Sequence, residues 1–147
     1  MNVIVVGAGK VGYIVAERLS REESNNVMVI ENDAQAADKV ASLNVSLIND
    51  TGSNPRVLSD AMKMNDPDVI ISTVARDEDN LFICMMAKSL KPDVKTIARI
   101  RDRDYMPSSE EEESIAAKLV DEVFSPEISC ASLIATLATL ENAIEYN

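Results

Sequence analysis

The sequence contains no histidine and only two cysteines. Histidine is the commonest general acid or base in enzymes, so its absence removes the side chain that many catalytic mechanisms use near neutral pH. The cysteines, Cys84 and Cys130, lie in apolar, helix-like segments, with no metal-ligand spacing around them. We therefore expect two buried thiols, and neither a disulfide nor a zinc site.

Positive charge is scarce as well. The chain has 14 Lys and Arg against 25 Asp and Glu, a net charge of -11. Such a surface repels nucleic acid and anionic lipid headgroups, so we expect no nucleic acid partner and no direct insertion into lipid. No run approaches the ~18 apolar residues that a membrane span needs, and the amino terminus lacks the pattern of a secretory signal. A cytoplasmic location is the expectation that follows.

The length of 147 residues suits one domain of ordinary size. Short β-branched runs alternate with segments of helical period, a pattern typical of parallel sheets with crossover helices. We predict a Rossmann-like α/β fold, in which a doubly wound parallel six-stranded sheet has helices on both faces and an extra C-terminal helix follows. The predicted strands are Val3–Val6, Val27–Ile30, Val45–Ile48, Val69–Thr73, Lys95–Ile100 and Glu122–Phe124.

Apolar stripes at helical spacing predict the connecting helices. One stripe consists of Val11, Ile14, Val15 and Leu19, and another consists of Val57, Leu58, Ala61 and Met62. Asn54 and Pro55 have the residue types of an N-cap and a first helical residue. The segment Leu81–Leu90, which includes Met85 and Met86, is apolar on most sides and predicts a buried helix. A Met-rich surface that binds a ligand is the alternative.

Four consecutive glutamates lie at positions 110–113, just after Ser109. Ser109 and Glu112 match a capping box, and the run would then occupy the first helical turn, where the helix dipole favours acidic side chains. A divalent-cation site is the alternative interpretation of this run.

The last segment predicts a helix of a different kind. Ser125 is expected to cap it and Pro126 to be its first residue. Its apolar residues at positions 133, 137, 140 and 144 are spaced as in one half of a helix pair. We divide the chain into a sheet domain, 1–125, and a C-terminal helix, 126–147. This helix either packs back on its own domain or docks on another subunit.

Glycine is scarce, and three of the four glycines lie in the motif Gly7-Ala8-Gly9-Lys10-Val11-Gly12. The motif follows a predicted strand and opens a predicted helix, the context in which G-x-G-x-x-G binds a dinucleotide. Gly7 permits the tight turn, Gly9 lets the backbone approach a pyrophosphate, and Gly12 lets the helix pack on the strand. The free N–H groups at the helix start would then point at the diphosphate.

Glu31 lies nineteen residues beyond Gly12, at the end of the second predicted strand. An acid at this point accepts hydrogen bonds from the hydroxyls of the adenosine ribose. Because it would also repel a 2′-phosphate, we predict NAD or NADH and not NADPH. The alternative is a solvated residue at a strand end. Lys10 does not belong to a Walker motif, since G-x-x-x-x-G-K-[ST] is not matched, and is expected beside the phosphates.

Enzymes that transfer hydride with such a domain usually carry a second region that binds substrate and supplies an acid or base. The chain has no G-x-S-x-G elbow and no Ser-x-x-Lys motif, and its three tyrosines are scattered. We therefore predict a nucleotide sensor and no enzyme. An NAD-dependent oxidoreductase, or its detached cofactor-binding domain, is the alternative.

Further motifs give the chain a family resemblance. They are Asp50–Leu58 after the third strand, Asp77–Asn80 before the fourth helix, Thr96–Ile100 on the fifth strand and Ser125–Glu127 before the last helix. With the glycine motif in front of them, nearly the whole chain resembles the KTN (or RCK N-terminal) domain family of potassium-uptake regulators. The resemblance is greatest to the TrkA-type NAD-binding subunit of the Trk system.

The resemblance implies a peripheral cytoplasmic protein, a homo-dimer or tetramer, that binds NAD(H), or ATP or ADP in related branches. Such a protein gates potassium flux through a membrane potassium transporter subunit. By position, Gly7–Val11 would hold the diphosphate and Glu31 the ribose. Asp50 and Thr51 would lie near the adenine, Thr73 and Val74 would line the nucleotide, and Arg99 would reach phosphate oxygens. A structural salt bridge is the alternative for Arg99.

Two features depart from the family pattern. Many relatives have Thr-Gly or Thr-Ser before the acidic cluster, where this chain has Val74-Ala75-Arg76. Arg76 then either contacts a phosphate or pairs with Asp77. The family usually also carries a C-terminal ligand-binding lobe, for which no residues follow Asn147. A single-domain member and a piece of a longer protein are both compatible with this.

Overall fold

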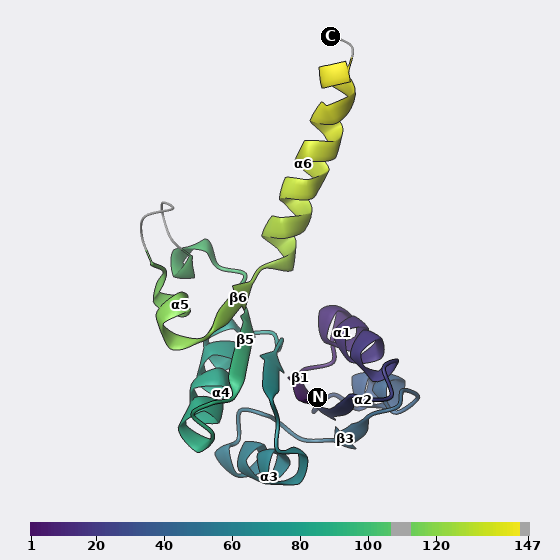
Figure 1. Cartoon of the computed structure of the whole chain (residues 1–147), viewed down its shortest axis with the longest axis vertical. Helices are drawn as coiled ribbons and strands as arrows, with labels where there is room; N and C mark the ends of the chain where they lie inside the picture. Colours follow the sequence, from purple (N-terminus) through teal and green to yellow (C-terminus); the bar gives the residue numbers. More distant parts are fainter. Residues whose placement is uncertain (107–112, 145–147) are drawn as a thin grey trace.

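A computed structural model of the chain describes residues 1–106 and 113–144, with side chains described up to residue 140 (Figure 1). The strands are β1 (Asn2–Val6), β2 (Asn26–Ile30), β3 (Ser46–Ile48), β4 (Val69–Ser72), β5 (Lys95–Arg99) and β6 (Glu122–Phe124). The helices are α1 (Lys10–Ser20), α2 (Ala34–Val40), α3 (Pro55–Asn65), α4 (Asp77–Leu90), α5 (Ile115–Leu119) and α6 (Pro126–Ile144), with a 3-10 turn at Arg103–Tyr105.

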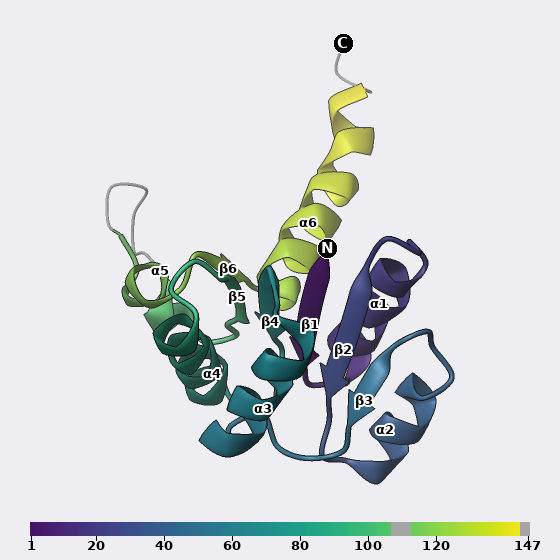
Figure 2. The same cartoon turned by 60° about the horizontal axis from the view of Figure 1, so that its bottom comes forward.

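The six strands form one parallel sheet in the order β3-β2-β1-β4-β5-β6 (Figure 2). In the middle of the sheet, Val3 of β1 pairs with Val27 on one side and with Val69 on the other. The direction of winding reverses between β1 and β4. In open parallel sheets, the crevice at such a switch point, beyond the carboxyl ends of the strands, is where ligands bind.

Apolar side chains cover both faces of the central strands. Ile4 and Val6 of β1 pack in a core with α3 and α4, whereas Val3 and Val5 pack in a second core that includes Ala16 of α1. Strands buried on both faces are apolar at every position, which explains the continuous Val and Ile runs. The predicted fold class, a Rossmann-like doubly wound sheet with an extra C-terminal helix, is confirmed.

The predictions for α3 and α1 have different outcomes. α3 begins as expected, because the Asn54 side chain accepts a hydrogen bond from the Arg56 N–H at 2.9 Å and Pro55 is the first residue. On α1, however, Ile14 is 49% exposed, and the buried positions are Gly12, Ala16 and Ser20. The small residues face the sheet because α1 packs very close to β1.

α4 and Cys130 depart from the predicted burial. α4 buries Leu81, Ile83, Cys84 and Ala87 but exposes Phe82, Met85 and Leu90, so the expectation of a helix buried on most sides is wrong. Only one face of α4 lies against the sheet. Burial raises the pKa of the Cys84 thiol to about 12. Cys130 is exposed, contrary to expectation, because it lies on α6.

The predicted capping box of Ser109 and Glu112 lies outside the described residues, as do positions 110–112 of the glutamate run and hence its cation-site alternative. The helix that follows begins at Ile115, and its N-cap is Ser114, whose Oγ accepts from the Ala117 N–H at 2.9 Å. Glu113 therefore precedes the helix and is not in its first turn. Among the described residues, no group of three or more acidic, cysteine or histidine side chains is placed to hold a metal ion.

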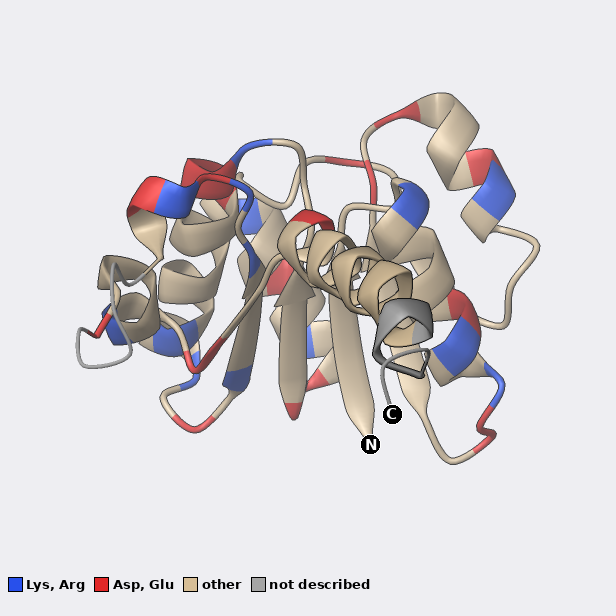
Figure 3. Cartoon of the chain, turned by 90° about the horizontal axis from the view of Figure 1, so that it is seen from above, with Lys and Arg blue, Asp and Glu red and all other residues tan. Residues whose placement is uncertain are grey.

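α6 extends away from the sheet domain (Figure 1), and every residue from 131 to 140 is exposed. Between positions 128 and 140 it carries no charged residue, so the blue and red of the domain stop at its base (Figure 3). Pro126 is its first residue, as predicted, but the Ser125 Oγ is buried, has no hydrogen-bond partner among the described residues and does not cap the helix. In the part of the chain that is described, no helix is both long and apolar enough to cross a membrane.

Candidate functional site

The turn from β1 into α1 is closely packed against the end of β4. Gly7 has φ +91°, and a Cβ there would lie 2.9 Å from the carbonyl oxygen of Thr73. At Gly12 a Cβ would lie only 1.9 Å from the Gly7 carbonyl oxygen. Both positions therefore require glycine for the fold itself, since no other residue adopts this turn or permits this approach without strain.

Gly9 differs from the other two glycines of the motif, Gly7 and Gly12, because a Cβ at position 9 would meet no atom within 4 Å. Gly9 is the N-cap of α1, has extended backbone and makes no side-chain capping bond. The added atom would enter open space at the start of the helix. A helix N-terminus with free N–H groups attracts anions, and the missing side chain leaves room for one.

Glu31 lies beside this turn at the end of β2 and is only 8% exposed. Its Oε2 accepts a hydrogen bond from the Ala8 N–H at 2.5 Å, and its Oε1 accepts one from the Asp33 N–H at 2.9 Å. Glu31 is therefore not the solvated strand-end residue of the alternative interpretation. A carboxylate has about four acceptor positions, so two remain for other donors.

Two adjoining hollows open at the carboxyl edge of the sheet. The first is lined by Asp50, Thr51 and Arg76, among others, and the second by Gly9, Lys10, Thr73, Arg99 and Arg101, among others. Gly7, Glu31 and Val74 line both. The structure thus brings together nine of the residues predicted from the sequence. Ala8 lines a neighbouring hollow between α1 and α2, and Val11 and Gly12 line neither of the two.

Two buried polar atoms at these hollows have no hydrogen-bond partner within the described residues. They are the Oγ1 of Thr73 and the Nε of Arg99. Buried polar groups are nearly always paired in folded proteins, and an unpaired one costs about 1–3 kcal/mol. Both atoms lie on residues of the second hollow.

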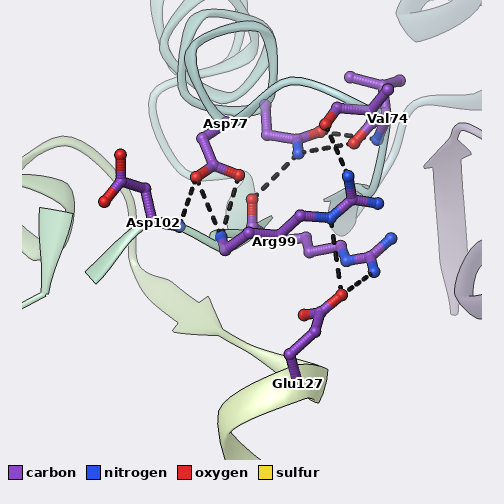
Figure 4. Close-up of polar contacts among 8 residues, drawn as sticks. Val74, Asp77, Arg99, Asp102 and Glu127 are labelled. Carbon is purple, nitrogen blue, oxygen red and sulfur yellow. Dashed lines mark hydrogen bonds and ion pairs between the residues drawn. The ribbon is translucent and has the colours of Figure 1, made fainter. Parts of the chain in front are cut away.

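Arg99 forms a salt bridge, the alternative left open by the sequence, and still lines the second hollow. Its Nη2 donates to Oε1 of Glu127 at 2.5 Å, and the Nε of Arg101 lies 3.6 Å from the same oxygen (Figure 4). The pKa of Glu127 is lowered, first by a hydrogen bond from its own backbone N–H and then by Arg99. Arg76 lies 3.8 Å from Glu78 and makes no ion pair with Asp77.

Asn80, on α4, joins the ends of β4 and β5 at the crevice. It is fully buried, and its Oδ1 accepts from the Ser72 hydroxyl and from the Val74 N–H, both at 2.8 Å. Its Nδ2 donates to the carbonyl oxygens of Val74 and Arg99 at 3.1 and 3.0 Å. The amide of Asn80 thereby fixes the backbone on which two predicted site residues lie.

Asp77, the first residue of α4, holds the chain after β5. Its carboxylate accepts from the backbone N–H of Arg101 at 3.0 Å and of Asp102 at 2.8 Å (Figure 4). This contact sets the path of the backbone that carries Arg101 toward the second hollow. Asp77 and Asn80, in the first turn of α4, therefore hold the backbone of the site residues by hydrogen bonds.

The sequence model of a protein family, the TrkA-N domain family, matches residues 3–126 of this chain. The chain belongs to the TrkA-N domain family. The resemblance to TrkA-type proteins is thereby confirmed. This chain is 34% identical, over an alignment of 151 residues, to Trk system potassium uptake protein trkA homolog 1 of Methanosarcina mazei. The alignment covers 99% of this chain and 36% of the relative. The chain is 30% identical over 146 residues to Trk system potassium uptake protein TrkA of Vibrio alginolyticus, covering 99% and 31%. The chain spans about a third of the length of these curated relatives.

Solved structures share the fold. The TrkA-N domain of inner membrane protein ybaL from Escherichia coli superposes with a TM-score of 0.72 at 22% identity, over 92% of this chain and 95% of that one. The NAD(P)-binding domain of an exopolyphosphatase-related protein from Archaeoglobus fulgidus gives 0.70 at 15% identity, over 94% and 97%. dTDP-glucose 4,6-dehydratase from Bacillus anthracis, solved in complex with NAD, gives 0.60 at 20% identity, over 77% and 41%. At these identities the likeness concerns the fold alone.

Sequence reasoning gave no role to the two residues that support the site of this TrkA-N domain. Asp77 and Asn80 entered only as part of a family motif. The available signal is their position, because polar residues at the start of a largely apolar helix that follows a buried strand lie at the carboxyl edge of the sheet. Their partners, at the end of β5 and just after it, lie 19 to 25 residues further along the chain, and only the sheet order shows which strand end they contact.

Proposed function

We propose that this TrkA-N domain binds NAD or NADH at the carboxyl edge of its sheet. We further propose that it serves as a regulatory subunit that gates potassium transport through a Trk- or Ktr-type membrane partner. The observation that carries the ligand proposal is the open space at Gly9 next to the buried carboxylate of Glu31. The potassium-uptake names of the relatives support the transport role.

In this proposal the diphosphate lies against the backbone of residues 7–11, where Gly9 leaves room and α1 presents its free N–H groups. Glu31 accepts the ribose hydroxyls with the positions that Ala8 and Asp33 leave free. Asp50 and Thr51 lie beside the adenine, in the first hollow. Thr73, Val74 and Arg99 line the remainder of the ligand. ATP or ADP would use the same adenosine contacts.

A nucleotide moves a gate only if it binds the two conformations of the gate unequally, and ~1–3 kcal/mol of coupling is typical. The role is regulatory rather than catalytic in this proposal, and the names of the relatives refer to potassium uptake. An NAD-dependent oxidoreductase, or its detached cofactor-binding domain, is the second candidate, because enzymes are among the proteins that share the fold. NADH oxidation measured against a panel of carbonyl substrates distinguishes the two, and turnover would favour the enzyme.

Calorimetric titration with NAD, NADH, ATP and NADP tests the ligand proposal, and Gly9→Ala is the decisive variant. We expect NAD or NADH to bind below the millimolar range. We expect Gly9→Ala to weaken that binding by about tenfold, because a methyl group in front of the helix start excludes a phosphate oxygen from its hydrogen bonds. Its unfolding midpoint should stay close to that of the wild type, since the methyl group meets no protein atom within 4 Å.

Two results would count against the ligand proposal. One is the failure of all four nucleotides to bind below millimolar concentration. The other is a Gly9→Ala variant that binds NAD as tightly as the wild type, because the diphosphate would then lie elsewhere.

We also propose that α6 associates with a second copy of the chain, giving a dimer or, through a further contact, a tetramer. Leu133, Ile134, Leu137 and Leu140 are 50–65% exposed on this helix. An apolar stripe without charged neighbours is stable in water when another surface covers it. We further propose that the protein is cytoplasmic and that it reaches the inner face of the membrane through its transporter partner.

Leu137→Asp should dissociate this dimer, raising its dissociation constant by about tenfold or more, because a carboxylate in an apolar interface has to be desolvated. Ala135→Asp is the matched control, since residue 135 lies on the opposite side of α6 from the stripe. Mass in solution, followed by light scattering over a concentration series, is the measurement. An unchanged mass for Leu137→Asp, or an equal effect of both variants, would contradict the proposed interface.

A further inference from the structure

Glu127 is the residue through which α6 is tied to the crevice. Within residues 1–106 and 113–140, the only ion pairs or side-chain hydrogen bonds that α6 makes to the rest of the chain are those of Glu127 with Arg99 and Arg101. The backbone connection at Ser125 and the half-buried side chains of Pro126 and Ile128 are the remaining attachment. Among the described residues, Glu127 is therefore the one polar side chain that holds the base of α6, called the arm below, to the sheet domain.

The two arginines that contact Glu127, Arg99 and Arg101, also line the hollow that contains Gly9 and Lys10. The Arg99 side chain is only 12% exposed, and its Nε has no partner although its Nη2 contacts Glu127. Glu127 itself is not among the residues that line this hollow. Arg99 and Arg101 thus lie between a carboxylate on the arm and the space proposed for phosphates. Guanidinium binds carboxylate and phosphate oxygens with the same planar geometry, so either anion can serve as the partner of these two side chains.

We propose that Glu127 is the internal counter-ion of Arg99 and Arg101, and that the phosphates of a bound nucleotide displace it. Displacement releases the base of α6 and in this way links occupancy of the crevice to the position of the arm. The same carboxylate sets the charge preference of the site, because it offsets part of the positive charge that the two arginines offer. The inference rests on the proposed nucleotide site and assigns its regulation to one residue.

A series of ligands with a common adenosine group and increasing negative charge tests the charge preference. Glu127→Gln removes one negative charge and keeps the shape of the side chain. We expect ATP to bind about fivefold more tightly to this variant, ADP and AMP to gain progressively less, and adenosine to bind unchanged, since a partly exposed pair contributes up to about 1 kcal/mol.

Glu122→Gln is the matched control for this series. Glu122 is 60% exposed and pairs at 3.5 Å with Lys95 at the opposite end of β5 from Arg99. The control changes the net charge by the same amount, and we expect it to leave the charge series as in the wild type. A gain for ATP in both variants would reflect net charge alone and would overturn the inference.

The arm can be followed directly through Cys130, which is exposed and lies three residues after Glu127 on α6. The other cysteine, Cys84, is buried, and its pKa of about 12 keeps it unreactive toward a thiol-specific nitroxide. In the wild-type chain, ATP should increase the mobility of a label on Cys130. In Glu127→Gln the mobility should be high from the start and should not respond to ATP.

The outcomes separate the inference from the proposed function. If the wild type binds no nucleotide, both are overturned. If it binds nucleotide but the label does not respond, or if Glu127→Gln weakens adenosine and ATP equally, the counter-ion role is overturned and the nucleotide site stands. A steeper dependence on ligand charge, together with loss of the label's response, supports the inference.

Discussion

Replacing Gly12 with alanine is expected to destabilise the domain by about 3 kcal/mol or more. The new Cβ would lie 1.9 Å from the Gly7 carbonyl oxygen and 2.8 Å from the Cγ2 of Thr73. The first of these atoms belongs to the backbone of a turn that is itself fixed at φ +91°, so no side-chain rotation relieves the contact. α1 has to move away from β1, which opens the packing of Ala16 on Val5. Urea unfolding followed by circular dichroism measures the loss.

Gly9→Ala is the matched control for this prediction, because it adds the same methyl group three residues earlier in the same motif. Nothing lies within 4 Å of that methyl group, and the φ of -65° at Gly9 suits alanine. We expect the stability to change by less than about 1 kcal/mol, the range of an N-cap exchange. Equal destabilisation by both variants would contradict the distinction between Gly12, which is needed for packing, and Gly9, which leaves room for a ligand.

The fold could be predicted from the sequence because strands buried on both faces of a sheet consist of nearly continuous apolar residues. β1 is apolar over Val3–Val6 and β4 over Val69–Ile71, and such continuous apolar runs are typical of a sheet covered on both sides. The glycine motif then fixed where the first helix starts. The predicted strand ends differ from the observed ones by at most one residue, as at β5, which ends at Arg99 and not at Ile100, since the last residue of a strand is set by pairing with its neighbour.

Errors arose where burial depends on what lies opposite an element. Met85 and Phe82 are apolar and helical, but no described element covers their side of α4, so they are exposed. Cys130 was expected to be buried for the same reason and lies on the extended arm. The apolar character of a helix indicates that it needs a partner surface; it does not show whether that surface belongs to the same chain.

The candidate site divides in a similar way. Gly9 and Glu31 could be predicted because their spacing in a strand-turn-helix unit is local and directly readable. The pairing of Arg99 with Glu127 could not, since 28 residues separate them and the contact exists only because β5 lies next to β6. The same holds for Asn80, whose amide joins two strand ends.

Glu31→Ala is expected to weaken NAD binding by about 10- to 100-fold, because hydrogen bonds to a charged group contribute about 1.5–3 kcal/mol. The variant should lose much less affinity for NADP, or gain some, since the carboxylate that repels a 2′-phosphate is gone. The preference for NAD over NADP should therefore narrow. Calorimetric titration of both cofactors against both proteins gives the two ratios.

Glu31→Gln separates the two effects that alanine removes together. Its amide keeps one oxygen that can accept from the Ala8 N–H, as the Oε2 of Glu31 does at 2.5 Å, but carries no charge to repel a phosphate. We expect an intermediate loss for NAD and the same relief for NADP as in Glu31→Ala. Unfolding curves of both variants show whether the donors of Ala8 and Asp33 left without an acceptor destabilise the turn. An equal loss for NAD and NADP in a stably folded variant would mean that the carboxylate holds only the turn, and the ribose contact would have to be assigned to another residue.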